Sequence, residues 1–449
     1  MSKYKSKYKG YPTYKGSGVE WIGEVPEHWE VKPAYAVAIV RNGYPFKSEL
    51  FKREGVESDR LIRIRDIAGD DESIFTKEVC PDSATISNGD VLIGMDGDFN
   101  VHRWRRGPAK LNQRMCAASG RTEAITQFLS RCLPTPLRVI NDLAYATTVK
   151  HLSSYEILHT RIAVPPTHEL TNINVVLDRE TTRIDALITK KTRFIELLQE
   201  KRSALITHAV TKGLDPEVKM KDSGVEWIGE VPEHWTITKL KHVSRTLIGL
   251  TYAPEDVVDD GTGITVLRSS NIQDGQLDLA DIVQVRAVAD PELMVRVGDI
   301  LICSRNGSRA LIGKNIQLDE RSLGCTFGAF MTVVRGSFND FLYYVFNSTM
   351  FDANSALYMT STVNQLTISM IANMEVPLPP EEEQRAIVSH LRKGLSSLDV
   401  LLFKTQRSID LLKERRSALI TAAVTGKIDV RGWVPNALPQ THDLKGANT

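Results

Sequence analysis

An internal repeat constrains the fold of this chain more than any other feature. The segment SGVEWIGEVPEHW at residues 17–29 recurs unchanged at residues 223–235, 206 positions later. A second repeat closes each half: IELLQEKRSALITHAVT, from Ile195, returns as IDLLKERRSALITAAVT, from Ile409, 214 positions later. Because two distant blocks recur in the same order, the chain is a duplication in which one structural unit is written twice.

The two copies share their ends and differ in their middles. Residues 148–211 align without a gap on residues 362–425, so that a Pro-Pro pair of each copy coincides. The middles, residues 30–147 and 236–361, share little beyond fragments such as GDVLI and GDILI. This pattern indicates a common structural frame that holds two different recognition regions.

A long helix is predicted after each Pro-Pro pair, since proline is tolerated at the first helical position. In the second copy, three glutamates follow the prolines, and negative charge suits the first turn of a helix. Apolar residues then recur at intervals of three and four along roughly 40 residues, on the order of 60 Å of helix. Two stripes of this length pair most simply with each other as an antiparallel coiled coil. In the alternative, each helix packs on its own domain, but the stripe is too long for one small domain to cover.

Short alternating apolar segments, separated by Gly, Asn and Asp, predict mixed domains with a twisted sheet and many loops. The expected fold class is therefore α+β, with two similar domains, related by a pseudo-two-fold, joined by two long helices in an antiparallel coiled coil. The expected boundaries are 1–165 for the first domain with a basic N-terminal tail, 166–212 for the first helix, 213–378 for a linker and the second domain, 379–427 for the second helix, and 428–449 for a C-terminal tail.

Motifs for several catalytic chemistries are missing. An adenine methyltransferase would need an Asn/Asp-Pro-Pro-aromatic run, but the Pro-Pro pairs follow Val164 and Leu378. The chain also has no G-x-x-x-x-G-K-[ST] segment, which would cradle nucleotide phosphates. Asp82, Asp96 and Asp98 are interpreted as solvated turns rather than as a metal site.

Other features exclude further classes. The five cysteines include no CxxC pair, which favours buried reduced thiols over zinc ligands or disulfides. His28 and His234 each precede a tryptophan of the repeated segment, and a packing role is favoured over a catalytic one. No apolar run approaches the roughly 20 residues that span a bilayer, and no secretory signal follows the basic N-terminus, so we expect a cytoplasmic protein.

The net charge of +1, from 56 basic and 55 acidic residues, conceals local basic runs. Residues 101–114 carry five lysines and arginines and no acid, and residues 303–314 carry three and no acid. Local patches rather than the sum set the potential that phosphates feel, so the near-neutral total does not exclude nucleic-acid binding.

The paired SGVEWIGEVPEHW segments, the helices begun by Pro-Pro and the paired RSALIT endings resemble the specificity subunit of type I restriction–modification enzymes, over nearly the whole chain. The resemblance implies two target-recognition domains on a coiled-coil spacer, which read a bipartite double-stranded DNA target. It implies no catalytic site and no bound cofactor here: two methyltransferase subunits would dock and supply S-adenosylmethionine chemistry, and a restriction subunit is a further partner. The alternatives are a scaffold whose duplicated domains bind proteins, and an enzyme whose site has no recognisable motif.

Candidate DNA-contacting residues come from both middles. LRSSNIQDG, its first-copy counterpart IRIRDI, and CSRNGS resemble segments of such recognition domains, and arginine and asparagine suit guanine and adenine edges. TVKH at 148–151 and TVNQ at 362–365 are either one loop that reads different bases or simply exposed loop residues. The candidates are Arg63, Arg65, Arg103, Arg105, Arg106, Arg114 and Lys150 in the first copy, and Arg268, Asn271, Arg305, Asn306, Arg309, Asn364 and Gln365 in the second.

Single arginines contact phosphate more often than bases. The Asn-Gly-Ser after Arg305 suggests an exposed turn that enters a groove, which favours base reading there. Three like charges within four residues, Arg103, Arg105 and Arg106, suit phosphate contacts better, with Trp104 as a stacking or packing plane among them.

Overall fold

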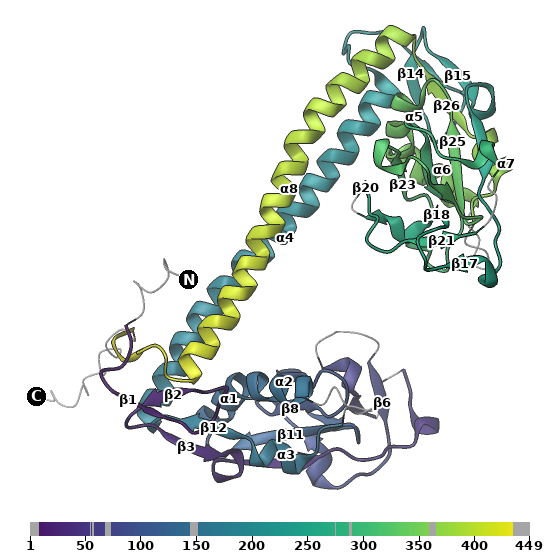
Figure 1. Ribbon diagram of the computed structural model, residues 1–449. Helices are drawn as coiled ribbons and strands as arrows, with labels where there is room; N and C mark the ends of the chain where they lie inside the picture. Colours follow the sequence, from purple (N-terminus) through teal and green to yellow (C-terminus); the bar gives the residue numbers. More distant parts are fainter. Residues whose placement is uncertain are drawn as a thin grey trace, which may run out of the picture. The chain divides into compact units, whose positions relative to one another are not determined.

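The computed structural model describes residues 9–53, 55, 58–67, 73–143, 151–273, 275–286, 290–358 and 365–433. These residues form two compact units, one from Met1–Lys190 with Ser408–Thr449 and the other from Lys191–Arg407, called unit 1 and unit 2 below. Each unit contains a mixed domain of strands and short helices, together with part of two long helices, α4 (Thr167–Lys212) and α8 (Glu381–Val424) (Figure 1). The α+β prediction with two similar domains and two long helices is confirmed.

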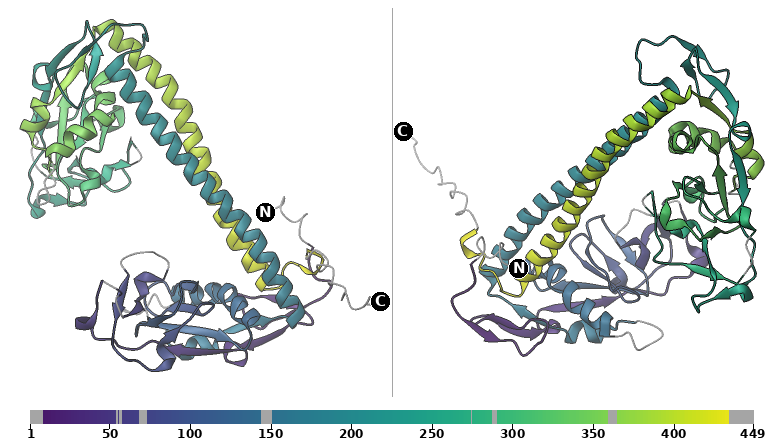
Figure 2. Two further views of the ribbon diagram at one scale, coloured as in Figure 1. Left: turned by 180° about the vertical axis from the view of Figure 1, so that it is seen from behind. Right: turned by 45° about the horizontal axis from the view of Figure 1, so that its top comes forward.

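The long helices lie side by side and antiparallel within each unit (Figure 2). In unit 1, Asp185 of α4 forms an ion pair of 2.9 Å with Arg416 of α8. In unit 2, Arg202 of α4 pairs with Asp399 of α8 at 3.4 Å. Residue numbers fall along α8 as they rise along α4, which defines the antiparallel register.

Buried apolar side chains of both helices join the core of each unit. Ile184 and Leu419 belong to the core of unit 1, while Ile206 and Leu391 belong to that of unit 2. The stripe read from the sequence therefore packs partly between the helices and partly against the domains.

The domain of unit 1 is built on two four-stranded sheets. The first has the order β4-β11-β8-β9, and the second has the order β6-β5-β10-β7. The bounds of the first sheet are β4 Ala38–Asn42, β8 Val91–Gly94, β9 Val101–Arg103 and β11 Met115–Gly120, and those of the second are β5 Asp59–Ile62, β6 Ile74–Thr76, β7 Thr85–Ile86 and β10 Ala109–Leu111. The remaining elements are β1 Tyr14–Gly16, β2 Glu24–Pro26, β3 Glu30–Pro33, β12 Arg161–Val164, α1 Glu123–Cys132, α2 Pro134–Leu143 and α3 Ser154–His159.

The domain of unit 2 repeats this plan. Its first sheet has the order β16-β25-β22-β23, and its second has the order β17-β21-β18-β24. The bounds are β16 Arg245–Ile248, β22 Ile300–Cys303, β23 Asn315–Gln317 and β25 Met331–Arg335, then β17 Val257–Val258, β18 Ile264–Leu267, β21 Val283–Val285 and β24 Thr326–Phe327. The remaining elements are β13 Met220–Asp222, β14 Glu230–Pro232, β15 Thr236–Lys239, β19 Ile272–Gln273, β20 Gln276–Leu277, β26 Glu375–Leu378, α5 Asn339–Phe346, α6 Thr349–Tyr358 and α7 Ile368–Asn373.

The Gly-Asp fragments shared by the two middles begin a central strand of each first sheet. Gly89 and Gly298 have φ of 103° and 88°, a conformation that glycine adopts without strain. The aspartate that follows each glycine is buried and held by an arginine: Asp90 pairs with Arg41 at 2.7 Å. The counterpart, Asp299, pairs with Arg335 at 2.6 Å. The duplication therefore extends through the middles, although their sequences have diverged.

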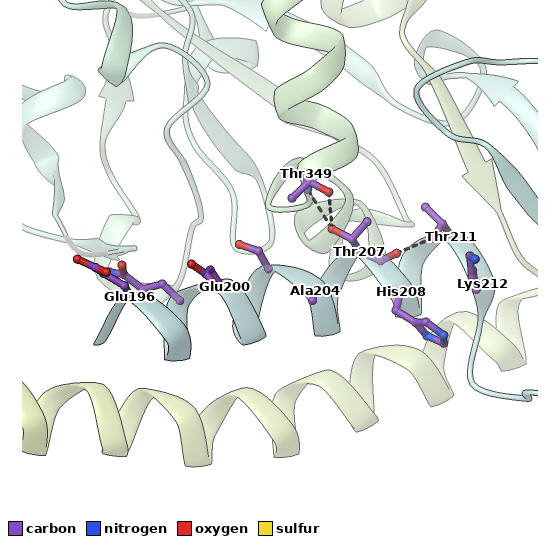
Figure 3. A pocket seen from close by; sticks show the side chains of 10 residues that line it. Glu196, Glu200, Ala204, Thr207, His208, Thr211, Lys212 and Thr349 are labelled. Atoms are coloured by element: carbon purple, nitrogen blue, oxygen red, sulfur yellow. Dashed lines mark hydrogen bonds between the residues drawn. The ribbon is translucent and has the colours of Figure 1, made fainter. Parts of the chain in front are cut away.

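Two threonines join α4 to the domain of unit 2 (Figure 3). The backbone N–H of Thr349, which begins α6, donates to Oγ1 of Thr207 at 3.0 Å, and the two hydroxyls lie 3.0 Å apart. An open trough of about 780 Å³ runs beside this contact. Thr421 holds the equivalent place on α8, where it lines a cleft of unit 1 instead.

The described cysteines are all free thiols, four of them buried. Burial raises the pKa of Cys116 to about 12, so this thiol stays protonated. Among the described residues, no group of three His, Cys, Asp or Glu side chains could hold a metal ion. No helix in the described part of the chain is long and apolar enough to cross a bilayer.

Candidate nucleic-acid interface

A short backbone bridge occurs at equivalent places in the two units. In unit 1, Asp96, just after β8, pairs in antiparallel fashion with His151, which lies before α3. In unit 2, Arg305, just after β22, pairs in the same way with Gln365, which lies before α7. Each bridge ties the end of a buried central strand to the segment that precedes a short helix.

Neighbouring backbone bonds confirm that the two bridges correspond. The N–H of Leu152 donates to the carbonyl of Met95 at 2.7 Å, and the N–H of Leu366 donates to the carbonyl of Ser304 at 2.8 Å. These bonds fix the backbone on which the bridge side chains stand, so the two sites have one frame.

A third position completes each site. The carbonyl of Arg114, directly before β11, accepts from the N–H of Met95 at 3.0 Å. The carbonyl of Phe330, directly before β25, accepts from the N–H of Ser304 at 3.0 Å. We call each set of three positions a bridge site, made of Asp96, His151 and Arg114 in unit 1, and of Arg305, Gln365 and Phe330 in unit 2.

The bridge site of unit 1 combines an acceptor with two donors. The Asp96 carboxylate lies 2.8 Å from Nδ1 of His151 and 3.4 Å from a guanidinium nitrogen of Arg114. His151 and Arg114 keep about half of their side chains exposed, at 47% and 59%. This acceptor and these donors can therefore meet polar groups of a ligand.

The bridge site of unit 2 offers different chemistry. The Arg305 guanidinium lies over the Phe330 ring, 5.1 Å from its centroid, which is a cation–π geometry. Phe330 is 59% exposed, and Arg305 is also exposed. Among the described residues, the Arg305 guanidinium forms no ion pair, so its donors are directed at solvent.

Sequence reasoning found only part of these two sites. It named Arg114, Arg305 and Gln365, and included His151 in a loop, but it took Asp96 for a solvated turn and missed Phe330. Lys150 and Asn364 lie outside the described residues. The signal for Asp96 was available, because this residue stands at the same distance from the Gly-Asp fragment as Arg305.

Arg63 and Arg268 stand at equivalent loops, as the match between IRIRDI and LRSSNI predicts. The backbone N–H of Arg63 donates to Asp66 at 2.9 Å, and that of Arg268 donates to Asn271 at 2.8 Å, each across a 3-10 turn. The Arg63 guanidinium also binds Asp66, while Arg268 pairs with Asp281 at 3.1 Å. Both arginines are therefore engaged within their own domains.

Asn271 and Asn306 support the loops of unit 2. Asn271 is 1% exposed, and its amide donates to the carbonyls of Asp278 and Asp281, each at 2.9 Å. Its side chain therefore holds the loop and does not present an amide to a base. The amide of Asn306 donates to Oγ of Ser269 at 3.1 Å, which ties the Arg305 loop to the Arg268 loop.

The basic run of unit 1 divides into different environments. Trp104 is fully buried, with Arg106 over its ring at 5.6 Å, so the indole is a packing plane rather than a stacking platform. Arg103 and Arg105 line a cleft together with residues of α4 and α8. Arg65 is exposed within the turn that follows Arg63, and Arg309 is exposed at the start of the 3-10 turn that follows the Arg305 loop.

The fold and the two bridge sites define a duplicated recognition protein: one frame presents different polar side chains at equivalent positions. Comparison with known proteins identifies the kind of recognition. The family model for the type I restriction modification DNA specificity domain matches twice, at residues 26–197 and 232–401.

Similar proteins of known name agree with this family match. The specificity subunit of the type I restriction enzyme EcoBI from Escherichia coli is 28% identical over 417 residues, covering 89% of this chain and 86% of that protein. The MjaVIII specificity subunit from Methanocaldococcus jannaschii is 23% identical over 430 residues, covering 91% and 94%. A solved chain from work on complex assembly and conformational transition of the type I R-M system has a TM-score of 0.65 at 17% identity and covers 89% of this chain and 98% of that one, a likeness of fold alone.

The chain belongs to the family of type I restriction–modification DNA specificity subunits. In type I restriction–modification systems, the specificity subunit recognises the DNA sequence and is not catalytic. DNA sequence recognition is therefore the role of this chain.

Proposed function

We propose that the two bridge sites read the two halves of a bipartite DNA target, one half for each unit. The observation that carries this proposal is that equivalent backbone positions hold Asp96, His151 and Arg114 in one unit but Arg305, Gln365 and Phe330 in the other. Arginine binds guanine in the major groove, glutamine binds adenine, and aspartate accepts from cytosine. Two sites with different donors and acceptors therefore select different bases.

Exposed arginines near the bridge sites hold the DNA backbone. Half or more of the hydrogen bonds in protein–DNA interfaces reach phosphate and sugar, and these bonds position the protein without specifying sequence. Arg65 and Arg309 suit this role because both are exposed. Asn271, which is buried and fully bonded, has no part in it.

The family and the duplication support the partners that we propose. Relatives are specificity subunits of multi-subunit enzymes, so this chain pairs with DNA and with other subunits of a restriction–modification complex. Because the segments at 17–29 and 223–235 are identical, each unit offers the same surface, and two methyltransferase subunits dock, one at each. They supply the S-adenosylmethionine chemistry on adenine, and a restriction subunit completes the complex.

Base reading by Arg305 is tested by DNA binding of the complex with its methyltransferase. Arg305→Ala should weaken binding to the cognate target by about 1–3 kcal/mol and relax one base pair of one half-site. Arg321→Ala is the control, since Arg321 is an exposed arginine of the same unit, paired with Asp319. If Arg305 only held phosphate, binding would weaken evenly on all sequences and the salt slope would fall by about one. Full affinity and an unchanged motif would remove Arg305 from the site.

A further inference from the structure

A cleft of about 780 Å³ lies in unit 1, between β9, α1 and the two long helices. Its walls carry more positive than negative charge, and Thr181, Thr182 and Thr421 also line it, with the Thr181 hydroxyl bonded to the carbonyl of Leu177. The charged residues of the lining are the arginines Arg103, Arg105, Arg131 and Arg416 and the acids Asp178 and Asp185.

Two of the four arginines are fixed by their neighbours. Arg416 pairs with Asp185 at 2.9 Å. Arg131 pairs with Asp178 and also donates to the backbone carbonyl of Asn174 at 3.0 Å and to its side-chain oxygen at 2.8 Å. These contacts use the two aspartates of the cleft.

The other two arginines retain unused donors. Arg103 pairs with Glu123 at the rim, yet its Nε is buried and has no hydrogen-bond partner within the part of the chain that the structure describes. Arg105 is exposed and, among these described residues, forms no ion pair. A buried donor without a partner costs free energy that a suitable acceptor would recover.

The arginines also repel one another. The pKa of Arg103 is lowered by burial and then by the charge of Arg105. The pKa of Arg131 is lowered by burial and by the charges of Arg103 and Arg105, against the opposite effect of Asp178. An anion placed among these groups would relieve the repulsion.

Unit 2 provides an internal comparison. Its helices keep the equivalent ion pair, Arg202 with Asp399, but the domain side presents Tyr343 and Tyr344. Arg103 pairs across its sheet with the first residue of β8, and the residue in this position of unit 2 is Gln317, opposite the first residue of β22. The arginine at this sheet position is therefore present in unit 1, and a glutamine replaces it in unit 2.

We propose that this cleft of unit 1 binds a phosphate group through Arg103 and Arg105, with the hydroxyls of Thr182 and Thr421 as further donors. The planar fork of arginine matches phosphate oxygens, and the hydroxyls donate to the remaining ones. The phosphate is either one of a DNA backbone or one of a free polyphosphate, since both present the same oxygens. This site consists of residues other than the bridge sites; its DNA-backbone alternative rests on the proposed function, whereas its free-polyphosphate alternative does not.

The test titrates the full chain with inorganic pyrophosphate and, separately, with a DNA duplex that lacks the target, and follows both by calorimetry. Arg103→Gln installs the residue that unit 2 has, and Arg105→Gln changes an exposed side chain, so this second variant should not disturb folding. Each variant should weaken binding of at least one of the two probes about tenfold or more. The control, Arg321→Gln, should leave both affinities unchanged.

The two probes identify the source of the phosphate. Loss confined to the duplex, with a salt slope smaller by about one, assigns the cleft to the DNA backbone. Loss of pyrophosphate binding assigns it to a free polyphosphate. Wild-type affinity of a folded Arg105→Gln chain for both probes, or no binding of either probe by the wild type, overturns the proposal. Arg305→Ala should keep pyrophosphate affinity, which separates this site from the readers.

Discussion

The indole Nε1 of Trp29 donates a hydrogen bond of 2.9 Å to the buried carboxylate of Glu169. Trp235 donates the equivalent bond to Glu383 at 3.1 Å in unit 2. Each tryptophan ends the repeated SGVEWIGEVPEHW segment, and each glutamate stands in the first turn of a long helix. Each copy of the repeat therefore anchors the start of a long helix to its domain.

Replacement of Glu169 by Gln should destabilise unit 1. The carboxylate is 2% exposed and accepts from Trp29, from Tyr11 at 3.1 Å and from His28 at 2.7 Å, whereas an amide offers only one acceptor oxygen. We expect a loss of about 1–3 kcal/mol in the free energy of unfolding, measured by denaturant titration. Glu383→Gln should cost less, since Glu383 is 28% exposed. Equal losses for the two variants would contradict this account of the anchor.

The same carboxylate should make stability depend on pH. Burial alone would raise the pKa of Glu169, but hydrogen bonds from Trp29, His28 and Tyr11 outweigh it and hold the pKa below its ordinary value of 4.5. A lowered pKa means that the stabilisation is complete above pH 4.5 and is lost as the pH falls through the folded-state value. The stability difference between wild type and Glu169→Gln should therefore shrink below pH 4.5. A difference that stays constant down to pH 3 would refute this.

Asp299→Ala should destabilise unit 2 strongly. Asp299 is 2% exposed and forms a fork with Arg335, a guanidinium that is 12% exposed and would lose its counter-charge and keep only its bonds to the carbonyls of Glu292 and Met294. The expected cost is about 3–5 kcal/mol, measured by thermal or denaturant unfolding. Asp319→Ala is the control: its pair with Arg321 is exposed, so its removal should cost under about 1 kcal/mol. Similar costs for the two variants would show that the fork does not hold the Gly-Asp turn.

Helix length should set the spacing between the two half-sites. Asp185 with Arg416 and Arg202 with Asp399 fix the register, so residues 189–195 of α4 oppose residues 406–412 of α8. Deleting both heptads keeps the flanking pairs in register and shortens the helices by about 10 Å, roughly the rise of three base pairs. Binding to the natural target should fall, and any retained motif should keep both half-sites with a changed spacer. A folded variant with unchanged spacing would exclude this role. Deleting only residues 189–195 is the mismatched control.

The sequence supported the architecture well, because periodicity and repetition are visible along the chain. The prolines before α4 and α8, and the three glutamates that open α8, predict where these helices begin. The Trp29–Glu169 bond was not predictable, since it joins residues 140 positions apart and depends on how the helix docks.

The candidate site was predicted less completely, because residue type does not reveal burial. Asn271 has the chemistry of an adenine reader, but its amide is consumed by loop carbonyls. Phe330 carries no polar group and gave no signal, yet it lies beneath the Arg305 guanidinium. The position of Asp96 in a bridge site could be inferred from the sequence only by comparing the two copies, since Arg305 stands at the equivalent position.

The central claim, that each bridge site reads its own half-site, is tested most directly by sequencing DNA methylation in cells that carry this chain with its methyltransferase. The wild type should produce adenine methylation at a split motif with two different halves. Arg305→Ala should relax one position of one half and leave the other half unchanged. An exchange at Asp96 should affect only the opposite half. A single continuous palindrome, or relaxation of both halves by Arg305→Ala, would contradict the account.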